Sequence, residues 1–225
     1  MKVGVDGVLI GSWASATGKR ILDAGTGCGV IALMLAQRIP DAEIIAIDID
    51  KSSIGEASEN FENSRWNERI RSLNISFKEL QNCEHESFDL IVSNPPFFES
   101  GVKHPTTVRE IARHQGEFSP SALVEGASGL LRTNGKLAMI VPSEYYDSLC
   151  EIGIACGLYP YRASFVKNKP TSQIKRVMLE FIKDCQIHNE SDASIREMSV
   201  LTMFDNNGCP TPEYVGLGRD FYLKF

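Results

Sequence analysis

The fold is constrained most by a short stretch near the N-terminus, in which an apolar strand-like segment, a glycine-rich turn and an apolar helix-like segment follow one another. The strand-like segment covers residues 19–24, the turn covers residues 25–29, and the helix-like segment covers residues 30–38 with Pro40 just beyond it. Glycines in such a turn let the backbone pass close to a ligand and enter the helix tightly. The stretch therefore predicts the first strand–turn–helix unit of an α/β sheet.

Strand-like and helix-like segments continue to alternate along most of the chain. Further strands are predicted at residues 43–49, 75–80, 88–93, 136–141, 161–166 and 175–182, and apolar alternation resumes at residues 200–204. Helices are predicted at residues 8–16, 51–64, 120–131 and 143–156. Residues 98–119 form a long polar connection, which in a compact domain is usually functional or mobile. The alternation predicts an α/β fold with a mostly parallel central sheet and helices on both faces.

The composition is typical of a soluble globular protein, with 225 residues, 43% of them hydrophobic and 23% charged. We expect one domain that spans residues 1–225. No apolar run approaches the roughly 20 residues that a membrane helix needs, and the first residues lack the apolar core of a signal peptide. Six scattered cysteines without a Cys-x-x-Cys pair predict reduced thiols in the cytoplasm and no metal site. The net charge of −6 argues against a protein coated in nucleic acid, although a local basic patch is compatible with it.

A carboxylate distinguishes this turn from the turns of dinucleotide-binding proteins. Those proteins carry Gly-x-Gly-x-x-Gly, whereas this chain has Gly25, Gly27 and Gly29, with Asp23 two residues ahead. The carboxylate would repel a pyrophosphate and attract a ligand that carries an ammonium or sulfonium group. The turn therefore favours a cationic ligand, and a tight connection that binds nothing is the alternative.

Two further acidic residues, Asp48 and Glu79, are candidate hydrogen-bond acceptors for a ligand. Asp48 lies 19 residues after the last glycine of the turn, where a carboxylate can accept hydrogen bonds from both hydroxyls of a ribose. Asp50 competes with it for this role, and a solvated strand end is the alternative. Glu79 is a candidate acceptor for an adenine amino group, with Lys78 and Glu84 close by in the sequence.

The segment Asn94-Pro95-Pro96-Phe97 follows the apolar run 88–92 and suits a planar amine. The Asn94 side-chain oxygen and the Pro95 carbonyl can both accept N–H hydrogen bonds, and Pro96 stiffens the backbone. The Phe97 ring can stack on a flat face. Together these groups indicate methyl transfer onto a planar nitrogen, whereas Asn-Pro on its own is common in turns.

In this order and spacing, residues 23–29, Asp48 and residues 94–97 resemble the amino-methylating class I S-adenosylmethionine-dependent methyltransferases, which have a Rossmann-like fold. Residues 2–13 resemble the opening of the bacterial tRNA (adenine-N6)-methyltransferases that modify the purine beside the anticodon of valine tRNA. Residues 94–101, 109–113 and 221–225 are also similar to that family. Val5 departs from the threonine usual there, Phe97 replaces the commoner tyrosine, and relatives carry a stretch that precedes residue 2.

The resemblance implies that S-adenosyl-L-methionine is the methyl donor and that its binding residues are Asp23, Gly25, Gly27, Gly29, Asp48 and Glu79. It implies that the catalytic residues are Asn94, Pro95, Pro96 and Phe97, acting on N6 of an adenine in tRNA. We expect a cytoplasmic monomer that needs no metal and no membrane. Candidate phosphate contacts are Lys103, His104, Arg109, Arg113 and His114 in the long connection, and Lys167, Lys169, Lys175 and Arg176 later in the chain. Ordinary solvated charges are the alternative for each of them.

Three other functions are compatible with parts of this pattern. Asn-Pro-Pro-Phe also suits guanine-N2 methyltransferases of ribosomal RNA, although those enzymes often carry a second, degenerate copy of the domain. Related tetrapeptides occur in protein-glutamine N5-methyltransferases, which usually have an added helical N-terminal domain. A catalytically idle Rossmann-like module that binds RNA or a protein partner is the non-enzymatic alternative.

Overall fold

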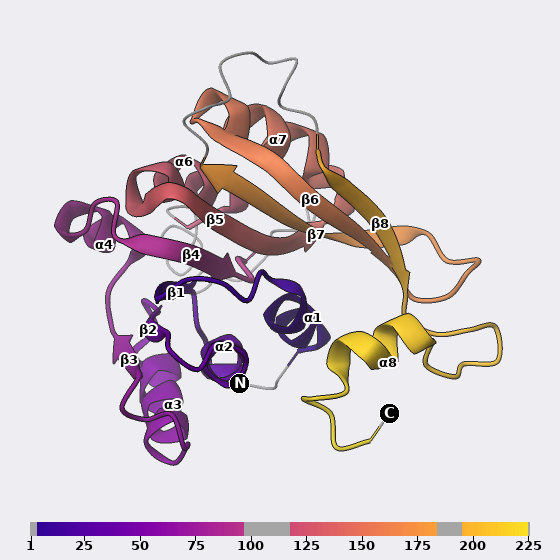
Figure 1. Ribbon diagram of the computed structural model, residues 1–225, viewed down its shortest axis with the longest axis horizontal. Coiled ribbons are helices and arrows are strands. Elements are labelled where there is room, and N and C mark those ends of the chain that lie inside the picture. Colours follow the sequence, from indigo (N-terminus) through magenta and orange to yellow (C-terminus); the bar gives the residue numbers. More distant parts are fainter. Residues whose placement is uncertain (1–3, 97–117, 184–194, 225) are drawn as a thin grey trace, which may run out of the picture.

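One eight-stranded sheet organises the protein (Figure 1). The computed structural model describes residues 4–96, 118–183 and 195–224. The parallel strands are β1 (Arg20–Ala24), β2 (Glu43–Ile47), β3 (Ile70–Leu73), β4 (Phe88–Ser93) and β5 (Leu131–Pro142). Strand β7 (Ile174–Lys183) lies antiparallel between β5 and β6 (Leu158–Lys167), and β8 (Glu197–Thr202) pairs in parallel with β6. The order β3-β2-β1-β4-β5-β7-β6-β8 confirms the predicted mostly parallel sheet.

Helices cover both faces of this sheet, as predicted. They are α1 (Val5–Trp13), α2 (Val30–Arg38), α3 (Lys51–Glu62), α4 (Phe77–Cys83), α6 (Pro120–Leu130), α7 (Tyr146–Ala155) and α8 (Pro212–Gly218), with a short 3-10 turn at Ser143–Tyr145. Successive strand residues point to opposite faces. Ile21 therefore joins the cluster that contains α1 and α2, whereas its neighbour Leu22 joins the cluster that contains α4 and α6.

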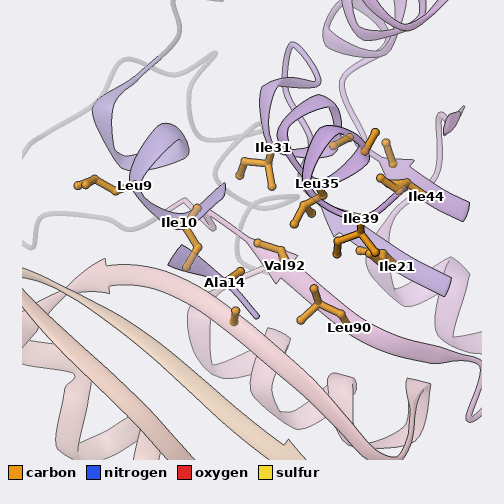
Figure 2. Packing of buried hydrophobic residues seen from close by; sticks show 14 of the residues in the cluster. Leu9, Ile10, Ala14, Ile21, Ile31, Leu35, Ile39, Ile44, Leu90 and Val92 are labelled. Carbon is orange, nitrogen blue, oxygen red and sulfur yellow. The ribbon is translucent and has the colours of Figure 1, made fainter. Parts of the chain in front are cut away.

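The first of these two clusters packs α1 and α2 against the sheet through aliphatic side chains (Figure 2). Ile10 and Leu35 are completely buried against Ile21 and Leu90 from the central strands. Burying an aliphatic side chain of this size stabilises a fold by about 1.5–3 kcal/mol. The packing fixes α2, whose first turn follows the glycine-rich connection, against the middle of the sheet.

The structure corrects several boundaries that the sequence predicts. The predicted strand at 75–80 is wrong, because this stretch contains the first part of α4 and the third strand lies earlier, at Ile70–Leu73. The first helix begins at Val5 instead of residue 8, and β5 begins at Leu131, directly after α6. Most of the long connection 98–119 lies outside the described residues. None of the helices in the described part of the chain has the length and apolar content that crossing a membrane requires.

The carboxyl ends of the three central strands lie at one level. Ala24 at the end of β1 pairs with Ile47 at the end of β2 and with Ser93 at the end of β4. Adjacent strands are about 4.8 Å apart. Side chains that directly follow these strands therefore gather at one edge of the sheet, which is where open α/β sheets bind their ligands.

Candidate active site

The turn between β1 and α2 needs glycine at the three predicted positions. Gly25, Gly27 and Gly29 have φ angles of +73°, +57° and +86°, in the left-handed region that residues with a Cβ rarely adopt. A Cβ on Gly29 would lie 2.4 Å from the Phe61 ring, and a Cβ on Gly25 would lie 2.9 Å from the Phe118 ring. Glycine is therefore required at these positions, and the turn is tied to the end of β2, because the N–H groups of Gly25 and Thr26 both donate to the Ile47 carbonyl at 2.9 Å.

Asp23 lies behind this turn and is completely buried. Its Oδ2 accepts hydrogen bonds from the Thr26 hydroxyl at 2.6 Å and from the Ala32 N–H at 3.1 Å. Its Oδ1 is buried and has no hydrogen-bond partner among the described residues. Burial raises the pKa of Asp23 to about 7, against the lowering effect of these two hydrogen bonds.

The surroundings of Asp23 fit a cationic ligand on the turn. A positive charge near a buried carboxylate favours its ionised form, and one carboxylate oxygen is not used by the described residues. The space that a Cβ would occupy at Gly25 and Gly29 is filled by the Phe118 and Phe61 rings, so the fit to a ligand rests on the Asp23 carboxylate. The residues present therefore fit the sulfonium and ammonium groups of S-adenosylmethionine better than they fit a pyrophosphate.

Asp48 directly follows β2 and faces the same turn. Its Oδ2 accepts the Gly27 N–H at 3.0 Å, and its Oδ1 accepts the Asp50 N–H at 2.9 Å. Asp50, the competing candidate, caps α3 by accepting hydrogen bonds from the backbone of Ser52 and Ser53. A carboxylate has about four acceptor positions, so the half-buried Asp48 can still accept from a ligand. Its predicted role with a ribose stays a prediction.

Glu79 takes part in a capping box at the start of α4. Its Oε2 accepts the N–H and the hydroxyl of Ser76, each at 2.7 Å, and its own N–H donates to the Ser76 hydroxyl. These bonds from Ser76 lower the pKa of the exposed Glu79 carboxyl. They leave Oε1 without a hydrogen bond from the described residues, so the predicted contact with an adenine amino group stays a prediction.

Asn94 directly follows β4 at the level of the glycine-rich turn. The preceding Ser93 is buried, and its hydroxyl donates a hydrogen bond of 2.7 Å to the Ala24 carbonyl, which joins the ends of β4 and β1. Pro95 is buried and Pro96 is half-buried. The half-buried Asn94 amide has no hydrogen bond to any of the described residues. Phe97 lies outside the described residues.

Phe118 is a residue of this region that the sequence pattern did not reveal. It packs against Gly25 of the turn and lies 5.5 Å, between ring centroids, from Phe77 at the start of α4. The available signal was an aromatic residue directly before the helix start Ser119-Pro120. Phe118 thus packs the start of α4 against the glycine-rich turn.

The predicted basic residues are distributed unevenly. Those of the long connection, from Lys103 to His114, lie outside the described residues. Arg176 forms an ion pair with Asp6 at 3.1 Å, and the Lys167 ammonium donates to the Pro170 carbonyl at 3.0 Å. The described residues contain no cluster of three or more His, Cys, Asp or Glu that could hold a metal ion.

Comparison with known proteins gives consistent matches. The family described as methyltransferase small domain matches residues 7–148. Proteins named tRNA1(Val) (adenine(37)-N6)-methyltransferase from Bacteroides fragilis and Trichodesmium erythraeum are 39% and 40% identical to this chain, covering all of it and 92% of their own length. The protein of that name from Flavobacterium johnsoniae is 39% identical over the whole chain and 93% of its own length.

Solved structures agree on the fold. A protein from Agrobacterium tumefaciens described as a predicted O-methyltransferase aligns with a TM-score of 0.72 at 20% identity, over 96% of both chains. A methyltransferase from Pyrococcus furiosus aligns with a TM-score of 0.53 at 22% identity, over 79% of this chain and 80% of its own. At these identities the likeness shows the shared Rossmann-like fold.

Proposed function

The chain belongs to the methyltransferase small-domain family and, within it, to the tRNA1(Val) (adenine(37)-N6)-methyltransferases, and on this premise we propose that it methylates N6 of an adenine beside the anticodon of valine tRNA. The observation that carries the proposal is the common level of the strand ends. Ala24 pairs with both Ile47 and Ser93, so the glycine-rich turn, Asp48 and Asn94 share one edge. A methyl donor and a planar amine can therefore be bound side by side.

The cofactor side of this edge supplies a cradle for S-adenosyl-L-methionine, which brings a methyl group already activated on a sulfonium. The turn from Gly25 to Gly29 directly follows the buried Asp23, whose carboxylate supplies negative charge behind it. Asp48 accepts from the ribose hydroxyls, and Glu79 accepts from the adenine amino group. These roles are supported by the acceptor oxygens of both residues: Asp48 accepts the Gly27 N–H of the turn, and the Glu79 carboxylate keeps Oε1 unused by the described residues.

The acceptor side positions the amine. The lone pair of the adenine N6 is delocalised into the ring, so the amine is a weak nucleophile. The Asn94 side-chain oxygen and the Pro95 carbonyl accept its two N–H groups and favour a tetrahedral nitrogen, which makes the lone pair available. Pro96 keeps the backbone rigid and Phe97 stacks on the base. Orienting two reactants in this way can contribute roughly 7–11 kcal/mol to lowering the barrier.

The base has to leave its stack before it can reach Asn94. Bases in single-stranded loops are exposed at lower cost than paired bases, which suits a purine of the anticodon loop. We also propose that residues 1–225 act as one catalytic domain in a monomer, because the described strands form a single sheet and one chain supplies every group named above.

Mass spectrometry of nucleosides tests the proposed function. tRNA that lacks the modification is incubated with the protein and S-adenosylmethionine, then digested to nucleosides. New N6-methyladenosine in valine tRNA is expected, with Asn94→Ala as the inactive control. New N2-methylguanosine in ribosomal RNA, or a methylated protein glutamine, would instead assign one of the competing activities. Absence of heat in calorimetry with S-adenosylmethionine would favour the idle binding module.

A further inference from the structure

The connection between β6 and β7 projects beyond the edge that carries the candidate active site. Strand β5 continues three residues past Met139, the partner of Ser93, to Pro142. Pro142 pairs with Arg176, and β7 begins two residues further on, at Ile174. At about 3.3 Å per residue, the start of the connection lies roughly 16 Å beyond the end of β4 along the strands. Figure 1 shows this connection extending past the tip of β4.

This projecting hairpin, which we define as residues 167–175, is basic. It carries Lys167, Lys169 and Lys175, and the chain contains no Asp or Glu from Tyr161 to Leu179. The described acidic groups form no ion pair with any of these three lysines. Because the whole chain has a net charge of −6, the hairpin is a local positive region on an acidic protein.

The hairpin is also held in place relative to the glycine-rich turn. Within it, the Ser172 N–H donates to the Lys169 carbonyl at 3.0 Å, and the Lys169 N–H donates to the Ser172 hydroxyl at 3.3 Å. At its base, Arg176 pairs with Asp6 in the first turn of α1. Helix α1 packs against α2, which the turn precedes. Arg176 thus anchors the hairpin, while the lysines present its charge.

We propose that the hairpin binds the sugar–phosphate backbone of the tRNA while the target base lies at Asn94, an inference that rests on the proposed function. Strand β5 lies between β4 and β7, the nearer arm of the hairpin, which gives a lateral distance of roughly 10 Å in addition to the 16 Å along the strands. At that separation the lysines cannot touch the base at Asn94. They contact other nucleotides of the same RNA, and lysine acts on phosphate as a point charge.

Lys169 and Lys175 are suited to a test because their side chains form no hydrogen bond or ion pair with the described residues. The test variant is Lys169→Gln with Lys175→Gln. The matched control is Lys19→Gln with Arg71→Gln, which removes the same charge from exposed positions at the start of β1 and in β3. Binding to valine tRNA is measured by fluorescence anisotropy across a salt series, and methylation is measured separately.

The hairpin variant is expected to bind tRNA roughly tenfold more weakly at about 0.1 M salt, and the slope of log K against log salt should become shallower by about 1.4–1.8. The KM for tRNA should rise, with kcat and the Kd for S-adenosylmethionine unchanged. The control should match the wild type. Equal weakening of both variants, or wild-type binding by the hairpin variant, would overturn the proposal.

The same measurements separate this proposal from the proposed function. If the wild type binds tRNA without methylating it, the function fails while the binding comparison still decides the role of the hairpin. If the wild type methylates tRNA and the hairpin variant does so with an unchanged KM, the hairpin proposal fails alone. If the wild type does not bind tRNA at all, both fail.

Discussion

The two halves of the candidate active site differ in how far their polar groups are already used. On the cofactor side, Asp23 and Asp48 each accept two hydrogen bonds from the protein, and three of these four come from the turn or the start of α2. On the acceptor side, the Asn94 amide has no partner among the described residues. The carboxylates on the cofactor side are therefore tied into the fold by hydrogen bonds, whereas the Asn94 amide is not and, on the proposed function, is available to the substrate. Substitutions on the cofactor side should therefore change stability and cofactor affinity together, whereas substitution of Asn94 should change kcat alone.

The largest effect is expected at Asn94. Asn94→Ala should lower kcat by roughly 10²–10³-fold, the scale on which loss of one positioned polar group slows an enzyme. It should leave the free energy of unfolding and the Kd for S-adenosylmethionine near their wild-type values, because no described contact is lost. Single-turnover methylation, chemical unfolding and calorimetry measure these three quantities. Asn94→Asp keeps an acceptor oxygen and should retain more activity than the alanine variant. Full activity of Asn94→Ala would refute the assignment.

On the cofactor side, Asp48→Ala should change binding and stability together. We expect the Kd for S-adenosylmethionine to rise roughly 10–100-fold and stability to fall by about 1–2 kcal/mol, because two backbone N–H groups lose their acceptor. Asp50→Ala is the matched control, since it removes the α3 cap at a cost of about 1 kcal/mol. It should leave the Kd within twofold. A larger effect on Kd for Asp50→Ala than for Asp48→Ala would reverse the two roles.

The protonation of Asp23 should make both the stability of the protein and its affinity for the cofactor depend on pH. Its pKa is about 7 in the folded protein and 3.8 in an ordinary environment, so the folded state holds a proton that the unfolded state has released. The free energy of unfolding of the ligand-free protein should therefore fall as pH rises from about 4 to 7, by up to about 4 kcal/mol from this group. Affinity for a cationic cofactor should rise about tenfold between pH 6 and pH 8, because the ionised form attracts it.

Calorimetry at pH 6 and pH 8 measures the change in cofactor affinity, and denaturant unfolding from pH 4 to pH 8 measures the opposite change in stability. Asp23→Asn cannot ionise, so both of its profiles should be flatter than those of the wild type, and its cofactor affinity should be lower at pH 8. A cofactor affinity that does not depend on pH in the wild type would remove Asp23 from the electrostatics of the site.

The sequence predicted well those features that depend on local backbone geometry and strand order. Gly25, Gly27 and Gly29 were predictable because left-handed turns demand glycine, and the shared edge followed from the parallel strands. The sheet order beyond β5, including the projecting hairpin, depends on pairings between distant segments that no local pattern encodes. The same limit concealed Phe118, whose contact with Gly25 joins residues 93 positions apart.

Some errors had a local cause that could have been recognised. The apolar alternation of residues 75–80 predicts a strand. Ser76 and Glu79 have the spacing of a capping box, which starts a helix, and in the structure this local signal prevails. The sequence lists Arg176 among the candidate phosphate contacts and cannot show its ion pair with Asp6, because the two residues are 170 positions apart. Charge patterns therefore predicted where basic residues lie and could not predict which of them are already paired.

The smallest effect is expected at Glu79. Its substitution tests whether this carboxylate contacts the cofactor or only caps α4. Its Oε2 serves the α4 cap and its Oε1 is left for the adenine amino group, so Glu79→Ala should raise the Kd for S-adenosylmethionine only about threefold, the scale of one exposed hydrogen bond. Ser76→Ala is the control, since it weakens the same cap by about 1 kcal/mol and keeps the carboxylate. Calorimetry that finds equal changes in Kd for the two variants would assign Glu79 to the helix alone, because loss of the cap would then account for both.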